Sequence, residues 1–224
     1  MSETIYTIPV TDAFNADSEC PLCEMYLKFQ EDAVKYYLGP SLMQPEIRIR
    51  TNNHGFCGKH FRQLLDSSAN RLGLGLIIDT YLKKQMEEMA GLASKPDKLV
   101  QYLKQHQEDC CICTGLEGTM ERYVEIILQR WEQNENFRKT FSQCKGFCQP
   151  HFTMLLESSG KYISGKRRKE FVSELMALQL DNLKRIEGDV DWFTKKFDYR
   201  YRDEDWKNSK DALERSVAKI TGRE

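Results

Sequence analysis

The chain has 224 residues, of which 40% are hydrophobic and 30% charged, a composition typical of a folded, water-soluble protein. Its 33 basic and 34 acidic residues nearly cancel, so no net positive field favours a nucleic-acid partner. No apolar run approaches the length of a membrane span, and the first 20 residues lack the basic and apolar regions of a signal peptide. We therefore expect a cytoplasmic protein without a membrane partner, whose reduced cysteines are ligands or redox groups.

The expected elements of the first half follow the apolar spacing. Residues 1–17 lack a helical period and predict an extended N-terminal arm. A helix is expected from the first cysteine pair to about Leu38, where Gly39 and Pro40 end it, followed by a loop over 40–54. A second helix begins near Cys57. We assign residues 18–95 to a first helical repeat.

The second half repeats this plan over residues 96–190. A helix follows Cys113, residues 134–145 are expected to form a loop, and another helix begins near Pro150. A long helix is predicted from about Arg167 to Phe197. Residues 191–224 mix aromatic and charged side chains and are predicted to pack on the body as a tail. The fold class is therefore mainly α, since nothing resembles a βαβ series or a run of hairpins.

Two cysteine pairs and two GFCxxHF blocks define the duplication. The block Gly55–Ser68 recurs as Gly146–Ser159, with nine of 14 positions identical. A CxxC pair precedes each block, at Cys20 and Cys23 and again at Cys110 and Cys113, separated from the block's cysteine by 33 and 34 residues. This order, CxxC, helix, loop, CxxH and helix, predicts two internally repeated metal-binding halves.

The ligand types and spacing indicate zinc. A structural zinc ion takes four thiolate or imidazole ligands at tetrahedral corners. CxxC supplies two thiolates from one turn, and CxxH at a helix start supplies a thiolate and an imidazole. We expect two zinc ions per chain, and ligands grouped within each repeat: Cys20, Cys23, Cys57 and His60 at one ion, and Cys110, Cys113, Cys148 and His151 at the other.

The sequence leaves several alternatives open. An iron–sulfur cluster accepts cysteine with an occasional histidine. A dithiol function of the CxxC pairs is less favoured, since no thioredoxin-like unit is expected. Cys111 could replace Cys110 as a ligand, whereas Cys144 has no counterpart in the first repeat. His54 and His106 fall outside the repeated ligand pattern.

The functional expectation is a zinc-stabilised interaction or regulatory module with an unknown protein partner. The sequence contains no phosphate-binding loop, nucleophile elbow or HExxH, and each set fills all four zinc positions, so the balance is against an enzyme. The first alternative is an iron–sulfur or thiol-based redox protein. A weaker one is a nucleic-acid-binding protein that uses the basic cluster Lys166–Lys169.

The chain resembles an uncharacterised family of bacterial cytoplasmic proteins of about this length. The segments that carry the resemblance are Ile8–Phe14, the CPLC pair, Tyr37–Gly39, both GFCxxH blocks, Asn70–Leu74, Phe197–Arg200 and Trp206–Ala212. The resemblance implies a shared fold and shared metal sites, and it supplies no mechanism.

Overall fold

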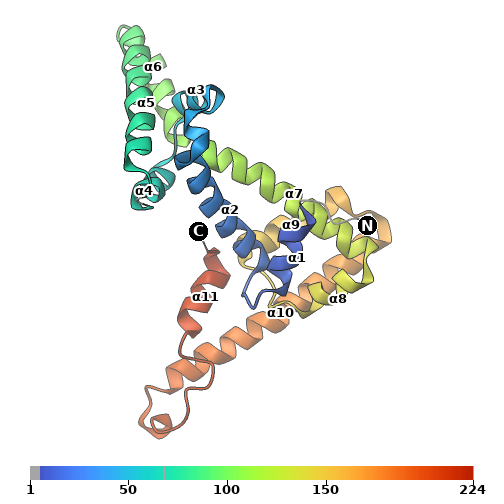
Figure 1. The fold of residues 1–224 in the computed structure, drawn as a ribbon. Helices are drawn as coiled ribbons and strands as arrows, with labels where there is room; N and C mark the ends of the chain where they lie inside the picture. Colours follow the sequence, from blue (N-terminus) through green and yellow to red (C-terminus); the bar gives the residue numbers. More distant parts are fainter. Residues whose placement is uncertain (1–5, 68, 224) are drawn as a thin grey trace. The chain divides into compact units, whose positions relative to one another are not determined.

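The computed structural model describes residues 6–67 and 69–223, and most of these residues lie in helices (Figure 1). Its described residues form eleven α-helices and two short 3-10 helices, with no strand, which confirms the mainly α prediction. The helices are α1 (Thr7–Asn15), α2 (Pro21–Leu38), η1 (Pro40–Met43), α3 (Pro45–His54), α4 (Gly58–Asp66), α5 (Arg71–Leu92), α6 (Pro96–Glu108), α7 (Cys111–Gln133), α8 (Glu135–Gln143), α9 (Gln149–Tyr162), α10 (Gly165–Lys195), η2 (Tyr199–Tyr201) and α11 (Ala212–Thr221).

The chain divides into two compact units. Unit 1 comprises Met1–Leu27 and Met120–Glu224, and unit 2 comprises Lys28–Thr119. These ranges differ from the predicted repeats 18–95 and 96–190, because α2 and α7 each begin in one unit and end in the other. Each unit thus combines the CxxC end of one repeat with the CxxH end of the other.

The N-terminal arm is not extended as expected, because Thr7–Asn15 forms helix α1. Val10, Ala13 and Phe14 are buried at helical spacing, and within unit 1 Phe14 stacks on Phe141 and lies edge-on to Phe137, both of α8. Pro9 lies in the first turn, where its missing amide hydrogen costs no helical bond. Residues 1–5 of the predicted arm lie outside the described residues.

The two expected loops are also largely helical. Residues 45–54 form α3, which starts at Pro45 and buries Ile47 and Thr51 one turn apart. Residues 135–143 form α8, whose N-cap Asn134 accepts a hydrogen bond from the Phe137 amide. α3 and α8 occupy equivalent places in the two repeats, so the duplication includes the connecting helix.

Each unit has its own core. In unit 1, Trp131 is fully buried, lies edge-on to Phe171 with ring centroids 5.0 Å apart, and donates a hydrogen bond to Glu174. In unit 2, buried residues of α2, α3, α4 and α5 surround Phe56, whose ring meets Tyr37 at 5.0 Å. Each core therefore includes the phenylalanine of a GFC block, Phe147 in unit 1 and Phe56 in unit 2.

Among the described residues, no helix combines the length and the apolar character needed to cross a membrane.

Candidate metal centres

All eight predicted ligands lie at the N-terminal ends of helices. Cys20 and Cys110 directly precede α2 and α7, and Cys57 and Cys148 are the N-cap residues of α4 and α9. The second ligand of every pair lies in the first turn. Helix N-termini carry partial positive charge, which favours the thiolate form that binds metals.

The glycine of each GFC block fixes the approach to its helix. Gly55 and Gly146 have φ values of +59° and +74°, a conformation that L side chains rarely adopt. A Cβ atom at Gly55 would also lie 2.6 Å from the Tyr81 ring, and one at Gly146 would lie 3.0 Å from Gln179 Oε1. Glycine is therefore required one residue before the buried phenylalanine and two before the ligand cysteine.

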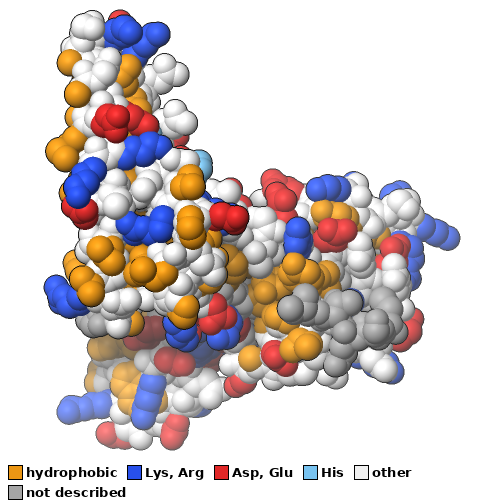
Figure 2. Space-filling model, turned by 45° about the horizontal axis from the view of Figure 1, so that its top comes forward, with side chains coloured by type: hydrophobic (Ala, Val, Ile, Leu, Met, Phe, Trp, Pro, Cys, Tyr) orange, Lys and Arg blue, Asp and Glu red, His pale blue; other side chains and the backbone are white. Residues whose placement is uncertain are grey.

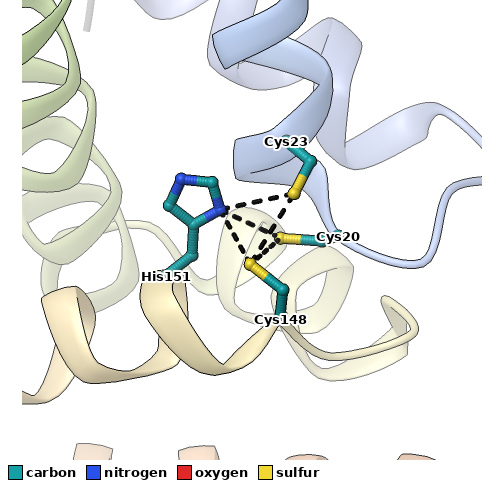
Figure 3. A group of neighbouring side chains, drawn as sticks. All are labelled: Cys20, Cys23, Cys148 and His151. Carbon is teal, nitrogen blue, oxygen red and sulfur yellow. Dashed lines mark hydrogen bonds between the residues drawn. The ribbon is translucent and has the colours of Figure 1, made fainter. Parts of the chain in front are cut away.

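Site 1 consists of Cys20, Cys23, Cys148 and His151, all of unit 1 and all buried (Figure 3). The Cys148 sulfur lies 3.8 Å from that of Cys20 and 3.6 Å from that of Cys23. His151 Nδ1 lies 3.5, 3.5 and 3.1 Å from the sulfurs of Cys20, Cys23 and Cys148. Standard zinc bond lengths at tetrahedral angles give edges of about 3.8 Å between sulfurs and about 3.6 Å between sulfur and nitrogen.

Site 2 consists of Cys57, His60, Cys110 and Cys113, all of unit 2. His60 Nδ1 lies 3.2 Å from the sulfurs of Cys57 and Cys110 and 3.4 Å from that of Cys113. The sulfurs of Cys57 and Cys113 are 3.8 Å apart. In both sites the four ligand atoms lie within 4.8 Å of one another, so both can hold one ion. Cys57 and Cys113 are only partly buried, which makes site 2 the more accessible.

The structure brings the eight predicted residues together in two sets, but the predicted grouping is wrong. The CxxC of the first repeat meets the CxxH of the second, and the CxxC of the second meets the CxxH of the first. The reason is the helix after each CxxC. α2 has 18 residues and α7 has 23, so they advance the chain by about 27 and 35 Å. The segments after these two helices, η1 with α3 and α8, are helical too. They are therefore too short to return the chain to the CxxC of its own repeat.

In both sets, a bound cation would stabilise the closely spaced sulfur ligands in their thiolate form. Burial disfavours a charged imidazole at His151, but hydrogen bonds to the three surrounding sulfurs outweigh it and raise its pKa to about 12. In site 2, burial and the neighbouring Cys110 sulfur raise the pKa of Cys113. Burial also lowers the pKa of His60 and keeps its imidazole in the neutral, ligating form. Thiolates gathered this closely repel one another unless a positive charge lies between them.

The other cysteines and histidines lie outside both sets. The Cys111 sulfur contacts the Arg50 carbonyl at 3.6 Å, so Cys110 and not Cys111 joins site 2. Burial raises the pKa of Cys111 and of Cys144 to about 12, which keeps both thiols protonated. His54 pairs with Asp109 at 2.7 Å, and His106 contacts the carbonyl of Tyr102.

A comparison with protein-family models matches residues 1–224 to a family of unknown function, DUF6062. The chain belongs to DUF6062. This confirms the expected resemblance to an uncharacterised family. No curated protein and no solved structure matches the chain.

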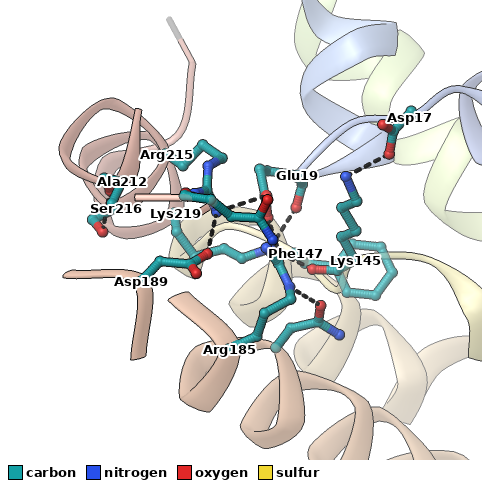
Figure 4. A network of polar contacts seen from close by, with 12 residues as sticks. Asp17, Glu19, Lys145, Phe147, Arg185, Asp189, Ala212, Arg215, Ser216 and Lys219 are labelled. Atoms are coloured by element: carbon teal, nitrogen blue, oxygen red, sulfur yellow. Dashed lines mark hydrogen bonds and ion pairs between the residues drawn. The ribbon is translucent and has the colours of Figure 1, made fainter. Parts of the chain in front are cut away.

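In this DUF6062 chain, the C-terminal helix α11 supports site 1. Lys219 is 1% exposed, and its ammonium donates to the carbonyls of Glu19 and Lys145, both at 2.5 Å (Figure 4). Glu19 directly precedes Cys20, and Lys145 lies three residues before Cys148. Beyond the helix, the amide of Arg223 lies 3.5 Å from the Cys23 sulfur. One segment thus holds both ligand-bearing turns.

The Glu19 carboxylate neutralises this buried ammonium. It lies 3.4 Å from Lys219, 2.5 Å from Arg185 of α10 and 3.7 Å from Arg215 of α11. Burial works against the ionised carboxylate, but Arg185 and Lys219 outweigh it and lower the pKa of Glu19. Arg215 also pairs with Asp189 at 3.0 Å, so the network ties α10 and α11 to the segment before Cys20 (Figure 4).

In site 2 a buried amide orients the ligand imidazole. Gln30 lies 3.2 Å from His60 Nε2, and Gln63 lies 3.5 Å from the Gln30 amide. When Nδ1 binds a metal, Nε2 carries the hydrogen and requires an acceptor. The amide orientation that meets this need turns Gln30 Oε1 toward His60, and the Gln63 amide must then turn as well, so that its Oε1, otherwise buried without a partner, accepts from Gln30 Nε2.

Sequence reasoning missed these supporting residues. Lys219 lies seven residues, or two helical turns, after the buried Ala212, and both are on the inward face of α11. This spacing is the sequence signal that could have indicated a buried lysine. Gln30 carries no such signal, because its partner His60 is 30 residues away in the sequence.

Proposed function

We propose that each set binds one zinc ion, two per chain, and that both ions serve to stabilise the fold. The main support is the spacing of the ligand atoms, because the distances between them match the edges of a tetrahedron around a single ion. Each ion joins the N-termini of two helices far apart in the sequence, so the free energy of metal binding becomes free energy of folding.

The same distances between ligand atoms favour a single ion over an iron–sulfur cluster. In a cluster, the protein sulfurs bind different iron atoms and surround a core of several irons and sulfides. Such ligands lie farther apart than those of one ion. With all ligand atoms within 4.8 Å of one another, the sets suit a mononuclear centre.

A structural role is supported by the closed ligand sets. Each ion would have four protein ligands, whereas a catalytic zinc keeps one position open for water or substrate. In site 1 all four ligands are buried, and the end of α11 lies against them, with Arg223 beside Cys23. We therefore favour a non-enzymatic protein.

We further propose that this zinc-stabilised protein is an interaction or regulatory module with a protein partner, acting in the cytoplasm, where thiols stay reduced. All eight cysteines are free thiols. Apolar side chains are exposed on the hairpin of α5 and α6, among them Leu72, Met86 and Val100. On the face shown in Figure 2, apolar patches lie among charges of both signs, an arrangement that suits a protein partner.

The nucleic-acid alternative has less support. Its basic cluster is engaged within unit 1, where Arg167 pairs with Glu170 at 2.9 Å and donates to the Glu132 carbonyl. Arg168 donates to the Ser159 hydroxyl. Arginines held in this way are less available to phosphate groups.

The test is elemental analysis of protein purified without air, together with its visible spectrum. We expect about two zinc ions per chain and no visible absorbance. Iron with matching sulfide and a broad visible band would replace this proposal with the redox alternative.

A further inference from the structure

Unit 2 contains a cavity of about 770 Å³ that the metal sites do not use. It lies between α2, the end of α3 and the first turns of α7. Its volume is within the range of about 300–1,000 Å³ that is usual for small-molecule pockets. The first turn of α7, between the site 2 residues Cys110 and Cys113, contributes Cys111 and Ile112 to its wall.

Most of the wall is apolar and much of it is aromatic. The lining residues of α2 are spaced three to four apart and so lie on one face of that helix. Gly115 of α7 lies opposite this face and has no side chain to fill the space. A Cβ atom at Gly115 would lie 3.3 Å from the Phe29 ring. The apolar lining residues are Phe29, Ala33, Tyr36, Tyr37, Ile112 and Gly115. A flat or branched apolar body fits between such walls.

The charged groups at the cavity decide which head group a ligand carries. Asp32 forms an ion pair with Lys28 at 2.8 Å, and Asp109 is hydrogen-bonded to His54 at 2.7 Å. The Arg50 guanidinium also lines the cavity. It hydrogen-bonds with the Tyr37 hydroxyl and makes no ion pair with any described carboxylate. The cavity therefore offers one guanidinium without a carboxylate partner, while each of its two carboxylates already has a partner.

From this arrangement we infer that the cavity is a binding site for a small amphipathic carboxylate. The apolar body lies among the aromatic rings of α2, and the carboxylate pairs with Arg50. A guanidinium matches a carboxylate through two parallel hydrogen bonds, which makes Arg50 the specificity-determining residue. This function goes beyond the structural role of the zinc sites and does not depend on it.

The test uses three probes that share a naphthalene body and differ in the head group. Naphthylacetate carries a carboxylate, naphthylacetamide is neutral, and naphthylethylammonium is a cation. Binding to the full, metal-loaded chain is measured by isothermal titration calorimetry. We expect naphthylacetate to bind at least about tenfold more tightly than either of the others.

Two variants locate the interaction. Arg50→Gln should weaken naphthylacetate binding by about tenfold or more and leave naphthylacetamide binding unchanged. Arg71→Gln is the matched control, because Arg71 is an exposed arginine of unit 2 that does not line the cavity. Ala33→Trp, which fills the cavity from α2, should weaken all binding, and Ala33→Leu should do so to a smaller extent.

The inference is overturned if naphthylacetate does not bind at millimolar concentration, or if the amide or the ammonium probe binds equally well. It is also overturned if Arg50→Gln and Arg71→Gln have the same effect, or if Ala33→Trp, folded by circular dichroism, binds naphthylacetate as the unchanged chain does.

Discussion

Replacing Lys219 with methionine tests whether α11 stabilises site 1. Methionine keeps the apolar stem and removes the ammonium, so the carbonyls of Glu19 and Lys145 lose the donor that lies 2.5 Å from each. An unsatisfied buried acceptor costs about 1–3 kcal/mol. Glu19 keeps Arg185 and Arg215, which limits the electrostatic loss. We expect Lys219→Met to lower the free energy of unfolding of unit 1 by about 2–4 kcal/mol.

That loss corresponds to a fall in melting temperature of about 5–15 °C for a chain of this size. It is measured by circular dichroism on metal-loaded protein, with zinc release to a chromophoric chelator followed in parallel. Release from site 1 should accelerate by about tenfold or more, because both ligand-bearing turns lose their anchor. Lys210→Met, at an exposed position of the same segment, is the control. If the two variants melt within about 1 °C of each other, Lys219 does not stabilise site 1.

Three further predictions concern the ligands and their surroundings. His151→Ala should lower the melting temperature by more than about 10 °C, whereas His54→Ala, which loses only a half-exposed pair with Asp109, should shift it by less than about 2 °C; equal shifts would contradict the ligand assignment. Gln30→Leu should weaken zinc binding at site 2 by about 10–100-fold, measured by chelator competition, and an unchanged affinity would exclude the orienting role of Gln30. Zinc release should be biphasic, with site 2 releasing its ion first because it is the more exposed, and the fast phase should be absent in Cys113→Ser. A single phase in the unchanged chain would contradict the difference in burial between the two sites.

The sequence predicts the ligands because their chemistry is local. CxxC and CxxH place two ligand atoms on one turn, and the duplicated order by itself favours Cys110 over Cys111. The helical class follows in the same way from apolar spacing within each segment. Both are properties of residues that lie close together in the chain.

The grouping of the ligands depends on distance along the fold, which the motifs do not contain. Had residues 40–54 been an extended loop, they could have returned Cys57 to the start of α2. They form η1 and α3 instead, and the 10 residues of α3 advance the chain by only about 15 Å. The role of Lys219 was equally hidden, because its partners Glu19 and Lys145 are 200 and 74 residues away.

Each candidate metal site takes its CxxC from one repeat and its CxxH from the other. The most direct measurement is the zinc content of two double variants purified without air. In this account Cys20→Ser with Cys148→Ser damages only site 1 and retains one zinc ion, while Cys20→Ser with Cys57→Ser damages both sites and retains close to none. The reverse result, with one ion kept by the Cys20 and Cys57 variant, would mean that the ligands are grouped within each repeat and would contradict the grouping across the repeats.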